Sequence, residues 1–310
     1  MIERMSELGA DRTKPGVIPL RPLGIAEILE GAVATIRKYP GLMLGVAFVV
    51  VALTELAGLV LTRTVLEDFQ RVVLPQGTLT RQQALDMLAD LAPVWGVTVA
   101  IGLVSRTLLS GLITVVVGRS VLGERLPGRV AWQQVRPRLV PLLGLTVLFS
   151  LLVAAAPVAG MALTLLLGGS GGTVFLIAGI VLAVWLYVRF SLATPALVLE
   201  PAGITQALRR SALLVRGAWG RTFGILLVAL LITFLISSVI QMPFSAAAGT
   251  GQGGSLGLGA ALLLTLGATI ARMITAPFTG AVTALVYVDR RMRKENMQHA
   301  LAQAARTEDD

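Results

Sequence analysis

Three ionisable residues, Glu55, Arg106 and Arg272, lie deep inside long apolar runs of the sequence. A charge within a hydrocarbon layer is costly unless it is paired or hydrated, so residues of this kind mark ion pairs, solute pathways or ligand sites. Measured from the basic loop beside each run, they lie about 12 to 15 residues in, which at the helical rise is a depth of roughly 18 to 23 Å. We therefore expect all three to share one polar layer.

The simplest arrangement of this layer pairs Glu55 with Arg106 on neighbouring spans, while Arg272 joins the pair or lines a wet cavity. The functional interpretation is a polar site for an anionic ligand, a lipid head group or a coupled ion. The structural interpretation is an ion pair that fixes the register of the helices, or arginines that extend toward the membrane surface. The sequence leaves both interpretations open.

Few other residues are suited to catalysis. The chain has no cysteine and one histidine, His299, near a polar tail, so neither a thiolate nor an imidazole metal centre is expected. The sequence holds no nucleophile with a recognisable base, no pair of carboxylates within the spans and no nucleotide-binding motif. We therefore expect no catalytic residue, no metal, no cofactor and no enzymatic activity.

The elements that carry the polar layer follow from the hydropathy of the chain. Of its 310 residues 55% are hydrophobic and 14% charged, and the mean hydropathy is +0.82, so lipid must cover much of the surface. Six apolar runs are each long enough to cross a hydrocarbon core of about 30 Å as a helix. They predict one membrane domain, residues 23–294, between polar tails at 1–22 and 295–310. The sequence thus predicts an all-α polytopic membrane protein with spans near 41–62, 94–118, 139–167, 173–194, 223–242 and 258–287.

The distribution of basic residues predicts the orientation of the spans. Of the 26 Lys and Arg residues, 21 lie on the side of the two termini and three, Arg63, Arg71 and Arg81, on the other side. By the positive-inside rule both termini are cytoplasmic, and we expect a multi-pass protein of the bacterial cytoplasmic membrane. The basic residues stand in short loops without interleaved aromatic residues, so no nucleic-acid partner is expected.

Three stretches on the cytoplasmic side, each before an odd-numbered span, have the apolar stripe of an amphipathic helix that lies along the bilayer. They begin near Ile25, Gly128 and Ile204. The first and the third match at a constant shift of 179 residues, which aligns Gly24 with Gly203. We interpret this as a degenerate threefold repeat of an amphipathic helix and a membrane hairpin.

Glycine and turn signals predict local contacts. The pairs Gly41 with Gly45 and Gly220 with Gly224 are typical of close helix approach at two span entrances. The uncharged glycine-rich connection at 168–172 predicts a tight turn, as does a second one at 246–257. In the connection at 63–93, Thr80 and Gln83 form a capping-box pattern, which predicts a short amphipathic helix on the outer side.

Arginines gather on the cytoplasmic side, where each attracts anionic lipid by about 1 kcal/mol near the membrane surface. Glu200 and Asp289 are expected to pair with some of these arginines as structural clamps, and Pro195 to kink or end the fourth span. Besides the lipid bilayer itself, anionic lipids and other membrane proteins are the candidate partners. The predicted lipid or partner contacts are Arg189, Arg209, Arg210, Arg216, Arg221, Arg290, Arg291 and Arg293.

Three blocks of the sequence carry a family resemblance: RPLGIAEILEGAVATIRKYPGLMLG from Arg21, RFSLATPALVLEPAGITQALRRSALLVRGAWGRTFGILL from Arg189, and PFTGAVTALVYVDRRMRKE from Pro277. They resemble the membrane domain that is fused to some bacterial glycerophosphoryl diester phosphodiesterases and that also forms stand-alone actinobacterial membrane proteins. The resemblance implies an all-helical membrane domain. Phosphodiesterase chemistry in that group belongs to a separate soluble domain, and none of its catalytic residues maps onto this sequence.

Two functions from different classes remain. The first is a non-enzymatic scaffold or accessory subunit for an envelope or lipid-related process, which would act through the amphipathic helices. The second is a transporter or channel for an anionic or lipidic solute, with Arg106 and Arg272 as its site. Convergence of Glu55, Arg106 and Arg272 on a hydrated cavity favours transport, whereas a dry, paired interior favours the scaffold.

Overall fold

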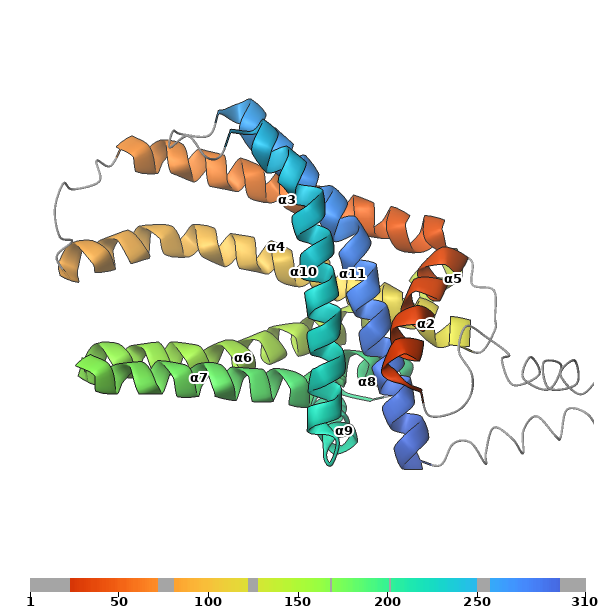
Figure 1. The fold of residues 1–310 in the computed structure, drawn as a ribbon. Coiled ribbons are helices and arrows are strands. Elements are labelled where there is room, and N and C mark those ends of the chain that lie inside the picture. The colour runs from red at the N-terminus through yellow and green to blue at the C-terminus, as the bar shows by residue number, and fades with distance from the viewer. Residues whose placement is uncertain are drawn as a thin grey trace, which may run out of the picture.

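The structure is a computed structural model that describes residues 23–71, 81–121, 128–167, 169–200, 202–249 and 257–295. Every regular element in these ranges is a helix, which confirms the all-α class. Figure 1 shows the elements in chain order. They are α2 (Ile25–Lys38), α3 (Pro40–Arg71), α4 (Arg81–Val121), α5 (Gly128–Val135), the 3₁₀ turn η1 (Arg136–Arg138), α6 (Leu139–Leu167), α7 (Gly169–Phe190), α8 (Ala193–Leu199), α9 (Ile204–Val215), α10 (Trp219–Ala247) and α11 (Leu258–Glu295).

Six helical segments in the described part of the chain are long and apolar enough to cross a membrane, as the sequence predicts. The protein is therefore a multi-pass integral membrane protein. Most bounds agree with the predicted spans within about five residues. The exceptions are the start of the third segment, which includes α5 and begins at Gly128 rather than at 139, and the end of the last, which continues to Glu295 in one long helix. The segments are Pro40–Leu61, Gly96–Val121, Gly128–Thr164, Thr173–Leu199, Trp219–Ala247 and Leu258–Glu295.

The six segments form three hairpins, α3 with α4, α6 with α7 and α10 with α11, and a short helix precedes each one. The short helices α2, α5 and α9 lie at one end of the molecule, which we call the basic end. Each short helix with the hairpin that follows it forms one unit of the predicted repeat, and the first and third units match. Gly24 and Gly203 are both extended, with ψ of 168° and 172°, before α2 and α9. The same shift of 179 residues that aligns these glycines also aligns the first residue of α3, Pro40, with that of α10, Trp219.

Two outer connections differ from the sequence expectation. The helix predicted after Thr80 is no separate element, because α4 runs without a break from Arg81 to Val121; Thr80 itself lies outside the described residues. Most of the predicted turn at 168–172 is helical, since α7 begins at Gly169. In both places the helix continues, because helical backbone satisfies its own hydrogen bonds within the segment.

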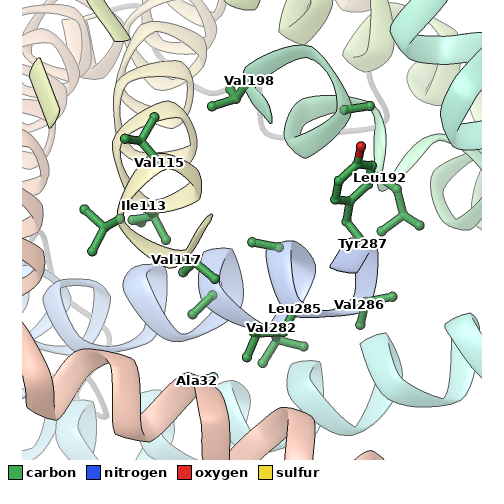
Figure 2. Close-up of a cluster of buried hydrophobic side chains, with 14 of the residues drawn as sticks. Ala32, Ile113, Val115, Val117, Leu192, Val198, Val282, Leu285, Val286 and Tyr287 are labelled. Atoms are coloured by element: carbon green, nitrogen blue, oxygen red, sulfur yellow. The ribbon is translucent and has the colours of Figure 1, made fainter. Parts of the chain in front are cut away.

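The buried core lies toward the basic end, around the second half of α11. Figure 2 shows Val282, Leu285, Val286 and Tyr287 of α11 at the centre, between side chains of α2, α4 and α8. Tyr287 and Leu285 are at most 1% exposed. Away from this core the helices turn large apolar side chains outward, such as Val239, which is 72% exposed. These surfaces are suited to lipid, which leaves the polar interior of the bundle as the place for a site.

Two helix backbones lie in close contact in the α6–α7 hairpin. A Cβ atom on Gly160 would lie 2.5 Å from the backbone oxygen of Phe175, and one on Gly179 would lie 2.5 Å from that of Ala156. The glycines predicted to make such contacts, Gly41, Gly45, Gly220 and Gly224, face open space instead, so that prediction is wrong. The spacing of small residues shows which pairs would permit close approach, but the facing helix decides which pair is used.

Candidate functional site

A cavity of about 470 Å³ lies among α3, α4, α6, α7, α8 and α11, and all three residues of the predicted polar layer line it. Glu55 comes from α3, Arg106 from α4 and Arg272 from α11. The volume is within the range of small-molecule sites in proteins. The lining is mixed: Val51, Leu109 and other apolar side chains share it with charged and hydroxyl groups. The three charged residues therefore line one cavity, as the sequence predicts.

Glu55 pairs with Arg272, whose guanidinium donates a hydrogen bond to the carboxylate. The pairing of Glu55 with Arg106 that the sequence analysis preferred is therefore wrong. The cause is the packing of α3, which lies against α11 as well as against α4, so that both arginine-bearing helices are neighbours of Glu55. The Glu55 side chain is 17% exposed and that of Arg272 is 62% exposed, so the arginine remains accessible from the cavity side.

Arg106 makes no ion pair with any described residue. Its guanidinium lies over the ring of Phe149 on α6, 5.8 Å from the ring centroid. A cation–π contact of this kind gives about 0.5–2 kcal/mol, which is small compared with the cost of a bare charge in hydrocarbon. Arg106 is thus the cavity's cation without a protein counter-charge.

Hydroxyl groups complete the polar part of the wall. Nine serines and threonines line the cavity, and the hydroxyl groups of Thr54 and Ser105, the neighbours of Glu55 and Arg106 in sequence, are hydrogen-bonded to each other. This bond holds α3 and α4 at the same level, in agreement with the shared layer expected from depth. Thr279 and Thr283 donate to the carbonyls four residues earlier, which leaves their oxygen lone pairs as acceptors.

The hydroxyl lining was missed by sequence analysis, although a signal for it exists. On α4 the lining residues Gly102, Ser105, Arg106, Leu109, Ser110, Ile113 and Thr114 follow the three-and-four spacing of one helix face. A helix in lipid that carries its arginine and its hydroxyl groups on one stripe is expected to turn that stripe toward the interior. A search for polar periodicity within the apolar runs would have found it.

The basic-end floor of the cavity is the short helix α8. α7 ends at Phe190 and the chain turns at Ser191 and Leu192 before α8 begins, because the ring of Pro195 cannot follow the carbonyl of Ser191 in a continuous helix. This confirms the predicted break. Ser211 of α9 bridges it, accepting from the Leu192 amide at 3.1 Å and donating to the Arg189 carbonyl at 2.9 Å.

Arg138 holds the other end of α8. One nitrogen of its guanidinium donates to the carbonyls of Leu197, Val198 and Glu200 at 2.6–2.7 Å. These are carbonyls at a helix C-terminus, which have no partner within the helix. A cation at this position also matches the negative end of the helix dipole. The broken segment under the cavity is therefore anchored by polar contacts at both ends.

Glu200 is a clamp, as the sequence predicts. Its carboxylate accepts hydrogen bonds from the Tyr287 hydroxyl and from Arg210, at 3.1 and 3.2 Å, and Arg291 lies 3.9 Å away. Partial burial by itself would lower the pKa of Arg210, but the hydrogen bond and charge of Glu200 together with Glu295 raise that pKa above its ordinary value. The network joins the end of α8 to α9 and α11.

Asp289 is the second clamp, and it is fully buried. Its carboxylate accepts from the backbone amide of Leu23 and from Arg293, each at 2.9 Å, and Arg221 lies 3.5 Å from it. Arg221 and Arg293 also donate to the Leu23 carbonyl, at 2.5 and 2.9 Å. The sequence predicts the pairing of Asp289 with arginines but gave no indication that Leu23 takes part.

Most of the arginines predicted as lipid or partner contacts are engaged in such internal contacts. Arg290 donates to the Leu214 carbonyl at 3.0 Å, and Arg189 lies over the ring of Trp185 at 4.8 Å. Arg210, Arg221, Arg291 and Arg293 belong to the two clamps. Arg209 on α9 and Arg216, the residue that caps its C-terminus, are exposed. A role in binding lipid stays a prediction, with Arg209 and Arg216 as the residues best placed for it.

The three sequence blocks that suggested a family meet at these clamps: Leu23 is in the first block, Glu200 and Arg221 are in the second, and Tyr287 and Asp289 are in the third. Comparison with known proteins agrees. No curated protein and no solved structure matches the chain. The family model described as the membrane domain of glycerophosphoryl diester phosphodiesterase matches residues 139–309, more than half of the chain. The chain belongs to this family of membrane domains.

Proposed function

We propose that this membrane protein binds an anionic solute or the anionic head group of a lipid in the cavity formed around Glu55, Arg106 and Arg272, and that it carries this ligand across or out of the bilayer without catalysing a reaction. The observation that supports the proposal most is Arg106, a cavity-lining cation with no counter-charge among the described residues. In an apolar layer such a charge is stable when water or an anion accompanies it.

The rest of the cavity supports the same ligand class. Arg272 is within reach of the same space, so two guanidinium groups face one carboxylate, and the excess charge is positive. Guanidinium groups bind carboxylates and phosphates through paired hydrogen bonds. Apolar side chains beside them suit a ligand that is partly hydrophobic. The single acid of the lining, Glu55, is already occupied by Arg272, which argues for binding rather than acid–base catalysis.

The thermal stability of the purified protein in the presence of anionic lipids and small anions tests this proposal. A ligand at about 100 times its Kd stabilises the native state by about 2.7 kcal/mol, which a melting curve detects. We expect at least one probe to raise the Tm of the wild type and to have no effect on the Arg106→Ala, Arg272→Ala double variant. The matched control is Arg209→Ala with Arg216→Ala, which removes the same charge from the exposed face of α9.

Two results would contradict the proposal. If the α9 control loses the ligand effect as fully as the cavity variant does, the anion binds at the basic surface. If no probe changes the Tm of the wild type, the three charges serve the fold, and the scaffold function gains support. Glu55→Ala would then destabilise the protein as much as Arg272→Ala does.

We further propose that the basic end faces the cytoplasm of a bacterial plasma membrane. The support is the distribution of charge, with 21 of 26 basic residues on that side. At this end the cavity is lined by α8, the short helix that follows the break before Pro195. This arrangement is consistent with a solute path that is closed toward the cytoplasm in this conformation.

A further inference from the structure

We infer that anion binding in this cavity is coupled to protonation of Glu55: the carboxylate occupies Arg272 when the site is empty, and uptake of a proton frees Arg272 to bind an oxyanion together with Arg106. The inference rests on the proposed function and adds a second, ionic substrate to it. The ligand class is an oxyanion, either the phosphodiester of a lipid head group or a free sulfate-like or phosphate-like anion.

This inference rests on a difference between the two arginines: Arg272 is paired with a carboxylate of the described chain and Arg106 is not. Arg106 lies over an aromatic ring and forms no ion pair with a described residue, so no described carboxylate has to be displaced for it to bind an anion. Arg272 donates to Glu55, which therefore occupies the position that an anion's oxygen would take. Any oxyanion that bridges the two guanidinium groups must displace a carboxylate of the protein. Displacing an ionised carboxylate into an apolar interior is costly, whereas a neutral carboxylic acid can leave the arginine at far lower cost.

The charged groups around Glu55 set the charge balance when an anion replaces Glu55 as the partner of Arg272. From α11 it faces Arg272, and from α4 it shares the cavity with Arg106; the other titratable group of the lining is Tyr187 on α7. The remaining wall residues from α6 and α8 carry no charge, and the charged residues of α2, the other neighbour of α3, do not line the cavity. Two guanidinium groups and one carboxylate give the empty site a net charge of +1. One proton together with one monovalent anion, such as a phosphodiester, leaves that charge unchanged, whereas one proton together with one sulfate dianion leaves the site neutral.

The step involves only proton transfer and ion-pair exchange. A proton from water adds to a carboxylate oxygen of Glu55 and forms an O–H bond, and the ion pair with Arg272 breaks. The oxyanion then accepts hydrogen bonds from Arg272 and Arg106, and no covalent bond of the ligand changes. The hydroxyl groups of Thr54 and Ser105 line the same cavity as the carboxylate, and hydroxyl oxygens can accept a hydrogen bond from the neutral acid.

The test is proton uptake on binding, measured with a pH indicator in weakly buffered solution. The probes are sulfate and micelles that contain phosphatidylglycerol, because neither anion titrates between about pH 5 and pH 8 and any proton taken up belongs to the protein. We expect about one proton per bound anion, and affinity that rises about tenfold per pH unit on acidification while Glu55 is ionised in the empty site. In Glu55→Gln, Arg272 is free at every pH, so binding is independent of pH and takes up no proton.

The control is Glu30→Gln, the same chemical change at an exposed carboxylate of α2 away from the cavity, which should behave as the wild type. Binding of sulfate would identify a soluble oxyanion as the ligand, and binding of phosphatidylglycerol alone a lipid head group. Binding to the wild type without proton uptake would overturn the coupling and leave the proposed function intact. Failure of both probes to bind the wild type at any pH would overturn both. Because proton uptake is measured on the wild type, the inference is testable even if Glu55→Gln does not fold.

Discussion

At the scale of single residues, many charged side chains at the basic end form ion pairs and hydrogen bonds between segments of the chain rather than extending into solvent. Asp289 and Glu200 each collect several donors from parts of the chain that are far apart in sequence. Buried carboxylates are costly unless they are paired and hydrogen-bonded. For Asp289 the hydrogen-bond donors are Arg293 and the backbone amide of Leu23, and Arg221 adds an ion pair at 3.5 Å. This explains why four of the eight arginines predicted to contact lipid pair with these two carboxylates.

Replacement of Asp289 by asparagine tests this use of charge. The amide can still accept a hydrogen bond from Leu23, but it removes the buried counter-charge of Arg221 and Arg293, whose side chains are about one-third exposed. Because water can partly compensate the two arginines, we expect Asp289→Asn to lower the free energy of unfolding by about 1–3 kcal/mol, measured by thermal unfolding of the purified protein. Glu30→Gln, the same change at an exposed position, should have almost no effect. Equal stability of the two variants would show that the clamp contributes little.

At the scale of elements, short helices and breaks decide where the cavity lies. α8 closes the cavity toward the basic end because Pro195 interrupts the fourth span and because Arg138 and Ser211 hold the interrupted segment in place. The α6–α7 hairpin is built differently, since its two helices touch through their backbones at Gly160 and Gly179. Only residues without a Cβ permit this contact, so the hairpin depends on them.

An alanine at Gly160 would place a methyl group 2.5 Å from the backbone oxygen of Phe175, and backbone cannot rotate away as a side chain can. We expect Gly160→Ala to separate α6 from α7 and to destabilise the protein by about 1–3 kcal/mol. Gly224→Ala in α10 is the matched control, because nothing lies within 4 Å of its added methyl. Thermal unfolding of both variants provides the comparison. A loss of stability at Gly224 and none at Gly160 would contradict the packing described above.

At the scale of the whole molecule, helices of all three units line the site, and its charged residues come from two of them. α3 and α4 of the first unit supply Glu55 and Arg106, and α11 of the third supplies Arg272. The ion pair between Glu55 and Arg272 therefore joins two repeats, as the Asp289 clamp does at the basic end. Relative movement of the units would have to break or exchange these contacts, and exchange with a bound anion is the route that we infer.

The orientation of the molecule can be tested directly, because the chain has no native cysteine. We expect a cysteine at Gln133, exposed on α5, to react with a membrane-impermeant maleimide only after the cells are opened. A cysteine at Gln252, in the glycine-rich connection before α11, should react in intact cells. The physical reason is the positive-inside rule applied to the 21 basic residues of the basic end. The reverse labelling pattern would place the termini outside.

The sequence alone predicted the class, the six spans, the short helices before each hairpin and the shared layer of Glu55, Arg106 and Arg272, which line one cavity. These features depend on hydropathy and helical rise, which are local properties that a single chain displays without reference to its fold. It also indicated the break at Pro195 and the pairing of Glu200 and Asp289 with arginines.

Only the tertiary structure decided which partners meet. Glu55 pairs with Arg272, 217 residues away, rather than with Arg106 on the next span, because α3 packs against both α4 and α11 and the rotation of each helix about its axis decides which side chain is within reach. The same reason applies to the glycines, of which Gly160 and Gly179 face a backbone while Gly220 and Gly224 face open space. The position of a residue along a helix follows from the sequence of that helix alone. Which residues of two helices face each other depends on how both helices pack, and the cavity forms where the faces of several helices meet.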